Sequence, residues 1–172
     1  KNVDKNINII EFVRKDSKSI ESIIIQYACH PVCDPNGIVG ADYPGYLKNF
    51  LNHINYKNIL FMQGFCGDIR PKVIKENIKL KDKLIKLIIG DRFRRIKKGD
   101  AEYLAKNLYK SITSNNPDQK DTLNNSIISK TIRLPIKMKD NGYIKNDLEI
   151  TLWLWDKICF IFMSAEVLSG YN

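Results

Sequence analysis

Apolar residues in the first third of the chain follow the pattern of β-strands. Residues 6–13 and 20–28 are rich in β-branched side chains, and the turn-forming residues 15–18 separate them. We therefore expect these two strands to form a hairpin. Residues 58–63 are a shorter apolar run that stops at Gly64, and they predict a third strand.

The last third of the chain is also strand-like. Apolar and polar residues alternate over 132–138 and again over 148–154, which predicts two strands with one apolar face each. Residues 158–163 are continuously apolar. For this segment we expect a central strand that is covered on both faces.

Between these strands the apolar spacing is helical. In 46–55 it predicts a helix that starts near Asp42 or Tyr43. A helical basic region over 73–115 contains two further stripes, with Gly90 between them. The first stripe is Leu80, Leu84, Leu87 and Ile88, and the second is Ala101, Leu104, Ala105, Leu108 and Ile112.

Strands with intervening helices predict an α/β fold, a layered domain with a mixed β-sheet and flanking helices. The chain has 172 residues, of which 44% are hydrophobic. A chain of this length can bury a core of its own, so we expect a single domain over 1–172. No apolar run is long enough to cross a bilayer, and no signal peptide is visible, so the compartment stays open.

The net charge of +9 is concentrated in one segment. Residues 72–98 contain eleven Lys and Arg against three acids, a net charge of +8. Such a segment can attract an anionic surface, or it can be a solvated helix face. The charges are not interleaved with a set of aromatic side chains, so we expect no specific recognition of nucleic acid.

The four cysteines show no paired spacing of the kind that zinc sites use. They are Cys29, Cys33, Cys66 and Cys159. We expect them to be reduced and packed, and a disulfide is the alternative if the protein is secreted.

Polar residues follow three of the predicted strands. His30 ends one, the loop 64–71 follows another, and Glu166 follows the third. Ligands collect at strand ends in α/β sheets, so the three ends could share one site. His30 is either a metal ligand or a hydrogen-bonding residue, and Glu166 either binds a metal or begins a following helix. His53, off the helical stripe, is expected to face solvent.

The loop "GFCGDIRP", residues 64–71, adds charge to this set. Its glycines permit tight turns, and Asp68 and Arg70 supply a carboxylate and a guanidinium. A functional loop and an ordinary Gly-Asp turn both fit this composition.

Three ordered motifs carry a resemblance to a known family. "YACHPVCDPNGIVGADYPGYL", "ILFMQGFCGDIRP" and "IFMSAEVL" resemble the catalytic domain of the neutral (non-lysosomal) ceramidases and their shorter bacterial relatives. The similarity covers most of 5–72 and 130–168. It implies a zinc-dependent hydrolase that cleaves an amide-type bond in a small-molecule or lipid substrate by metal-activated water.

The resemblance also implies roles for individual residues. His30 and Glu166 match two zinc ligands, and Asp68 would orient the site. Arg70 stands where the long ceramidases carry a serine, and a guanidinium there would bind an anionic group. Gly40 likewise stands where the family usually has a serine.

The remaining family ligands are a histidine from a His-x-His segment and a tyrosine beyond the glutamate, and neither is in this sequence. Catalytic zinc ordinarily takes three protein ligands. We therefore expect the chain to be a segment of a larger catalytic domain. By itself it should be inactive, and the remainder of that domain would be its partner.

Two other functions fit the same sequence. The chain could be a catalytically inactive relative that binds anionic partners through residues 72–98. It could also be a hydrolase with Cys29 or Cys66 as nucleophile and His30 as base. Adjacent residues on a strand point to opposite faces, which disfavours the pair of Cys29 and His30.

Overall fold

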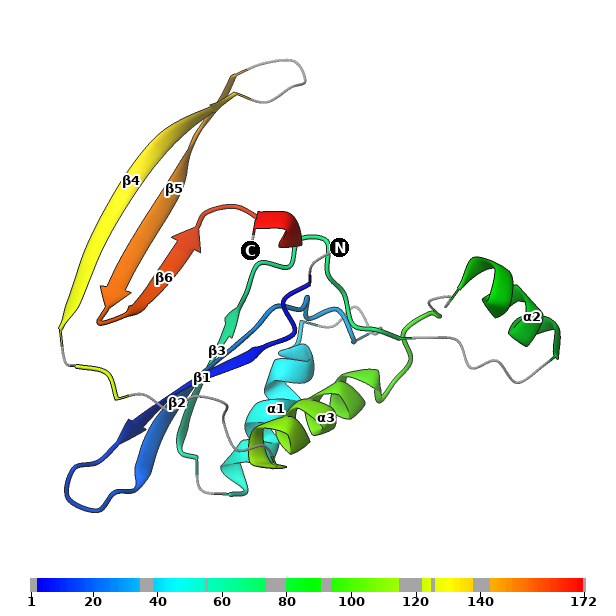
Figure 1. Ribbon diagram of the computed structural model, residues 1–172, viewed down its shortest axis with the longest axis horizontal. Coiled ribbons are helices and arrows are strands. Elements are labelled where there is room, and N and C mark those ends of the chain that lie inside the picture. Colours follow the sequence, from blue (N-terminus) through cyan, green and yellow to red (C-terminus); the bar gives the residue numbers. More distant parts are fainter. Residues whose placement is uncertain are drawn as a thin grey trace. The chain divides into compact units, whose positions relative to one another are not determined.

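The computed structural model divides the chain into two compact units (Figure 1). Unit 1 comprises residues 1–115 and 168–172, and unit 2 comprises residues 116–167. The structure describes residues 3–34, 39–54, 56–73, 80–90, 94–114, 122–124, 126–137 and 143–171.

Unit 1 contains a mixed three-stranded sheet in the order β1-β2-β3. β1 (Ile7–Val13) and β2 (Ile20–Tyr27) pair antiparallel, which confirms the predicted hairpin. β3 (Asn58–Gln63) pairs parallel with β2 and has the predicted bounds. A parallel pair needs a crossover connection, and α1 (Asp42–Asn52) lies in it.

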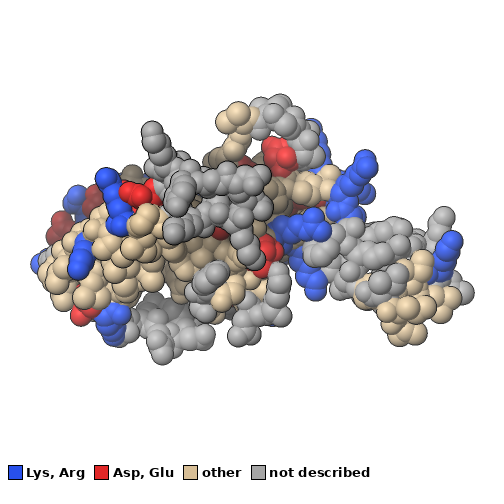
Figure 2. All heavy atoms as spheres, turned by 90° about the horizontal axis from the view of Figure 1, so that it is seen from above, with Lys and Arg blue, Asp and Glu red and all other residues tan. Residues whose placement is uncertain are grey.

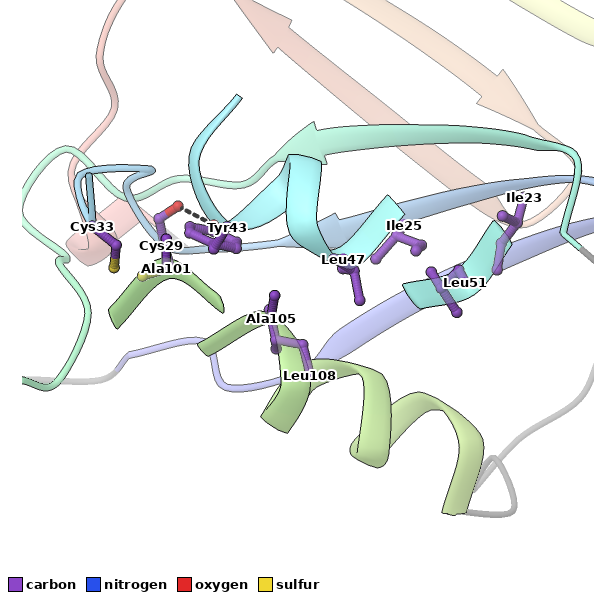
Figure 3. Packing of buried hydrophobic residues seen from close by; sticks show 10 residues of the cluster. All are labelled: Ile23, Ile25, Cys29, Cys33, Tyr43, Leu47, Leu51, Ala101, Ala105 and Leu108. Carbon is purple, nitrogen blue, oxygen red and sulfur yellow. Dashed lines mark hydrogen bonds between the residues drawn. The ribbon is translucent and has the colours of Figure 1, made fainter. Parts of the chain in front are cut away.

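Helices α1 and α3 (Asp100–Ser114) pack against each other and against β2 to form the core of unit 1. Figure 3 shows Ile23 and Ile25 of β2 lying beside Leu47 and Leu51 of α1. The α3 stripe is buried at Ala101, Ala105 and Leu108. Both helices therefore bury the apolar faces that their spacing predicts.

The predicted basic region contains two helices, and the described residues 94–99 before α3 are not helical. Its first helix, α2, runs over Leu80–Ile89 and ends before Gly90, which has a φ of 81°. Glycine adopts this left-handed conformation without strain, so it ends the helix efficiently. Residues 74–79, 91–93 and 115 of the region lie outside the described residues.

Unit 2 is an antiparallel three-stranded sheet in the order β4-β5-β6. β4 spans Ile127–Lys137, β5 spans Tyr143–Trp155 and β6 spans Ile158–Met163. The prediction of a covered central strand at 158–163 is wrong, because β6 lies at the edge of this sheet and its residues alternate between partly buried and exposed.

The fold is α/β, with a mixed sheet and flanking helices. No helix in the described ranges is long and apolar enough to cross a membrane. Figure 2 shows Lys and Arg side chains in separate groups among uncharged surface. The net charge is +9.

Candidate functional site

The candidate site lies at the carboxyl ends of β2 and β3. These strands are parallel neighbours, so the loops that follow them emerge side by side. The amide of Gly64 donates to the carbonyl of Tyr27 at 3.1 Å, and the amide of His30 donates to the carbonyl of Ile69 at 3.2 Å. A Cβ on Gly64 would overlap Nε2 of Gln26 and lie 3.0 Å from the Cβ of Ala28, so this close approach favours glycine.

His30 is half-buried at the strand exit. The side-chain amide nitrogen of Gln63 lies 3.4 Å from His30 Nδ1 and 2.9 Å from Cys66 Sγ. Gln63 is the last residue of β3, so a rigid sheet position holds this amide between the ring and the thiol. The arrangement gives the Nδ1 edge of the imidazole a polar neighbour.

Asp42 anchors the loop that follows His30. Its carboxylate is buried, and one oxygen accepts hydrogen bonds from the amides of Cys33 at 2.6 Å and Asp34 at 2.7 Å. The other oxygen accepts from the amide of Tyr43 at 2.6 Å. Asp42 has a φ of 48°, a left-handed conformation that aspartate tolerates better than most residues. These bonds hold the loop against the start of α1.

Tyr43 anchors the other side of His30. Its hydroxyl donates to the carbonyl of Cys29 at 2.6 Å, drawn as the dashed line in Figure 3. The ring is fully buried and meets Phe61 edge to face, with the centroids 5.6 Å apart. Burial raises the pKa of the Tyr43 phenol well above its usual range, so the hydroxyl keeps its proton and remains a donor.

Asp68 binds the C-terminal segment of unit 1. Its two carboxylate oxygens accept from the amide of Ser169 at 2.7 Å and from the Ser169 hydroxyl at 3.1 Å. Ser169 is buried and begins the short 3₁₀ helix η1 (Ser169–Tyr171). Asp68 therefore fixes a segment of chain that is remote in sequence to the loop beside His30.

The structure places three of the four predicted site residues in adjoining loops of unit 1. Asp68 and Arg70 flank Ile69, whose carbonyl accepts from the amide of His30, and the Arg70 side chain is exposed. Glu166 belongs to unit 2. Its side chain is exposed, and the alternative that Glu166 begins a following helix is wrong, because residues 166–168 are not helical.

The four cysteines are free, as expected, and Cys29, Cys33 and Cys66 are buried. Burial raises the pKa of both Cys29 and Cys33 to about 12. Cys29 is therefore a protonated thiol at neutral pH, which opposes a role as nucleophile. Cys159 differs from the expectation of packing, because it is exposed.

Four residues that position the loops were not singled out from the sequence: Asp42, Tyr43, Gln63 and Ser169. Only Asp42 and Tyr43 carried a usable signal. A carboxylate and a phenol at the start of a helix both need partners when they are buried, and the loop just before them offers backbone amides and carbonyls.

Within the described ranges, no group of three or more His, Cys, Asp or Glu side chains is arranged to hold a metal ion. His53, by contrast with His30, is exposed just beyond the end of α1, and its exposure is as predicted.

Comparisons with protein-family models, with curated proteins and with solved structures found no match.

Proposed function

We propose that this chain is part of a zinc-dependent hydrolase that cleaves an amide-type bond, with His30 and Glu166 as two of the zinc ligands. The observation that carries the proposal is the mounting of His30. Its amide is bound by the carbonyl of Ile69, and the preceding carbonyl is bound by Tyr43. A metal-binding imidazole needs a fixed direction, and both bonds fix the backbone from which the imidazole projects.

The environment of the His30 ring fits zinc binding through Nε2. Such binding needs a proton on Nδ1 and an acceptor for that proton. The Gln63 amide is 3.4 Å from Nδ1, and its oxygen becomes the acceptor when the amide is turned by about 180°. The thiol of Cys66 then donates to the same oxygen.

Asp68 acts in this proposal as a positioning residue. It binds Ser169, which follows Glu166 by three residues, and so tethers the chain just beyond the second proposed ligand. Arg70 would bind an anionic group of the substrate, since a guanidinium pairs well with a carboxylate or phosphate. When bound, zinc would lower the pKa of a coordinated water and polarise the amide carbonyl.

Zinc content of the complete polypeptide tests the proposal. We expect His30→Ala and Glu166→Ala each to lose most of the metal that the unaltered protein retains after dialysis. His53→Ala and Glu102→Ala are matched controls, because both side chains are exposed in unit 1, and they should retain it. Undiminished zinc in both His30→Ala and Glu166→Ala would refute the assignment.

A further inference from the structure

Helix α2 exposes its apolar side chains instead of burying them. The exposed fractions are 56% for Leu84, 85% for Leu87 and 85% for Ile88. In the part of the chain that the structure describes, no other helix or strand packs extensively against α2. The contrast with α1 and α3, whose stripes are buried in the core, identifies α2 as a helix with an uncovered apolar face.

Two lysines border this apolar face. Successive helical residues turn by about 100°, so Leu84, Leu87 and Ile88 share an arc of about 100°. On the same wheel Lys83 lies just beyond Leu87. Lys81 lies just beyond Ile88, between it and the half-buried Ile85. Both lysines are exposed. The long stem of a lysine can lie along an apolar surface while its ammonium group reaches outward, so this arrangement suits an interface between apolar and anionic layers.

The surrounding sequence strengthens the positive charge. Residues 72–98 carry a net +8, and beyond α2 the side chains of Arg95, Lys97 and Lys98 are exposed. Figure 2 shows Lys and Arg side chains next to uncharged surface in the part of the chain that contains α2. The apolar stripe and the basic charge therefore occur together.

We propose that α2 binds the surface of an anionic lipid bilayer, with Leu84, Leu87 and Ile88 in the interface and Lys81 and Lys83 at the headgroups. This goes beyond the proposed hydrolase function and does not need zinc. A helix of ten residues is about 15 Å long, half the thickness of the hydrocarbon layer, so α2 would lie in the plane of the interface.

Other occupants fit the observations less well. A second copy of the chain would bring the same basic segment to the interface, and the like charges would repel. Nucleic acid would attract the lysines but offers no partner for a stripe of aliphatic side chains, and α2 contains no aromatic residue to stack on bases. An anionic bilayer satisfies both the charge and the apolar stripe.

Vesicle co-sedimentation of the full chain tests the proposal. We expect binding to vesicles of equimolar phosphatidylcholine and phosphatidylserine, and little binding to phosphatidylcholine alone. Leu87→Ser/Ile88→Ser and Lys81→Glu/Lys83→Glu should each weaken binding by about tenfold or more. The control Lys106→Glu/Lys110→Glu makes the same charge change at exposed positions of α3 and should retain most of the binding.

Three outcomes would overturn the proposal: equal binding to both vesicle types, full binding by Leu87→Ser/Ile88→Ser, or binding of a single-stranded oligonucleotide in place of vesicles. Circular dichroism of each variant establishes that the fold of the core persists, since none of the altered side chains lies in it. Vesicle binding without added zinc separates this inference from the proposed hydrolase function.

Discussion

The hydroxyl of Tyr43 donates a 2.6 Å hydrogen bond to the carbonyl oxygen of Cys29, and so ties the first turn of α1 to the exit of β2. The ring is fully buried, and the Cys29 side chain is buried as well. His30 is the next residue along the chain. A side chain of the core therefore fixes the backbone at the residue just before the proposed metal ligand.

Replacing Tyr43 with phenylalanine should destabilise the protein without creating a cavity. The ring stays in place against Phe61, but the buried carbonyl of Cys29 loses its donor. An unsatisfied buried group costs about 1–3 kcal/mol, so the free energy of unfolding should fall by about that amount in urea denaturation. Tyr46→Phe is the matched control in the same helix, since Tyr46 is 42% exposed, and it should change stability by less than about 0.5 kcal/mol. Equal effects of the two variants would contradict the role of the hydroxyl.

The Asp68–Ser169 contact should be measurable as a coupling between distant residues. Asp68→Ala removes both hydrogen bonds, whereas Ser169→Ala removes only the one from the hydroxyl at 3.1 Å. A double-mutant cycle should therefore give a coupling energy of about 1 kcal/mol in the free energy of unfolding. Asp68→Ala combined with Ser126→Ala is the control. Ser126 bonds locally to Asn124, so the two effects should add. Additive effects for Asp68 and Ser169 would show that the hydrogen bond from the Ser169 hydroxyl does not contribute to stability.

Cysteine labelling should separate one thiol from the other three. Cys29, Cys33 and Cys66 are buried, and burial raises the pKa of the first two to about 12, so neither contact with the reagent nor thiolate formation is favoured at pH 8. We expect iodoacetamide to add a single label to the native protein, at the exposed Cys159, and four labels in denaturant. Mass spectrometry counts the labels, and Cys159→Ser should abolish the native one. Rapid labelling of Cys29 or Cys66 would support the alternative in which one of these cysteines is a catalytic nucleophile.

Local patterns in the sequence were enough to predict most elements of the fold. Helix α1 and strands β2 and β3 follow directly from apolar spacing, because their periodicity reports which face is buried. The edge position of β6 could not be predicted from the apolar spacing. A continuous apolar run shows that both faces of a strand are apolar, but it does not say whether one strand or two pair with it.

The contacts of the candidate site were harder to predict, because they join residues that are far apart in the chain. Ser169 meets Asp68 across 101 residues, and no local pattern marks either as the other's partner. The juxtaposition of His30 and Gln63 depends on the register between β2 and β3, which pairs Tyr27 with Gln63. Residue type thus predicts which polar groups stand at the strand ends. The residues that contact these groups can be named only once the pairing of the strands is known.

The start of α3 should respond to pH through Asp100. Arg94 donates two hydrogen bonds to this carboxylate, at 2.6 and 2.8 Å, and the amide of Lys97 donates a third at 2.7 Å. The side chain of Asp100 is only 13% exposed. The bonds from Arg94, more than the opposing effect of burial, hold the pKa of Asp100 below its usual range.

A lowered pKa in the folded state means that the ionised carboxylate stabilises the protein above the unfolded pKa of about 3.9, and that this contribution is lost as the pH falls through the folded value. Asp100→Asn should therefore reduce the free energy of unfolding by about 1–2 kcal/mol at pH 7, and the difference from the unaltered protein should shrink below about pH 4. Urea denaturation at a series of pH values measures this. Glu102→Gln, a charge-removing change at an exposed position of the same first turn, should have a small effect at every pH. A difference for Asp100→Asn that stays constant down to pH 2 would show that the charge of Asp100 does not contribute, and that the remaining effect comes from the geometry of the helix start alone.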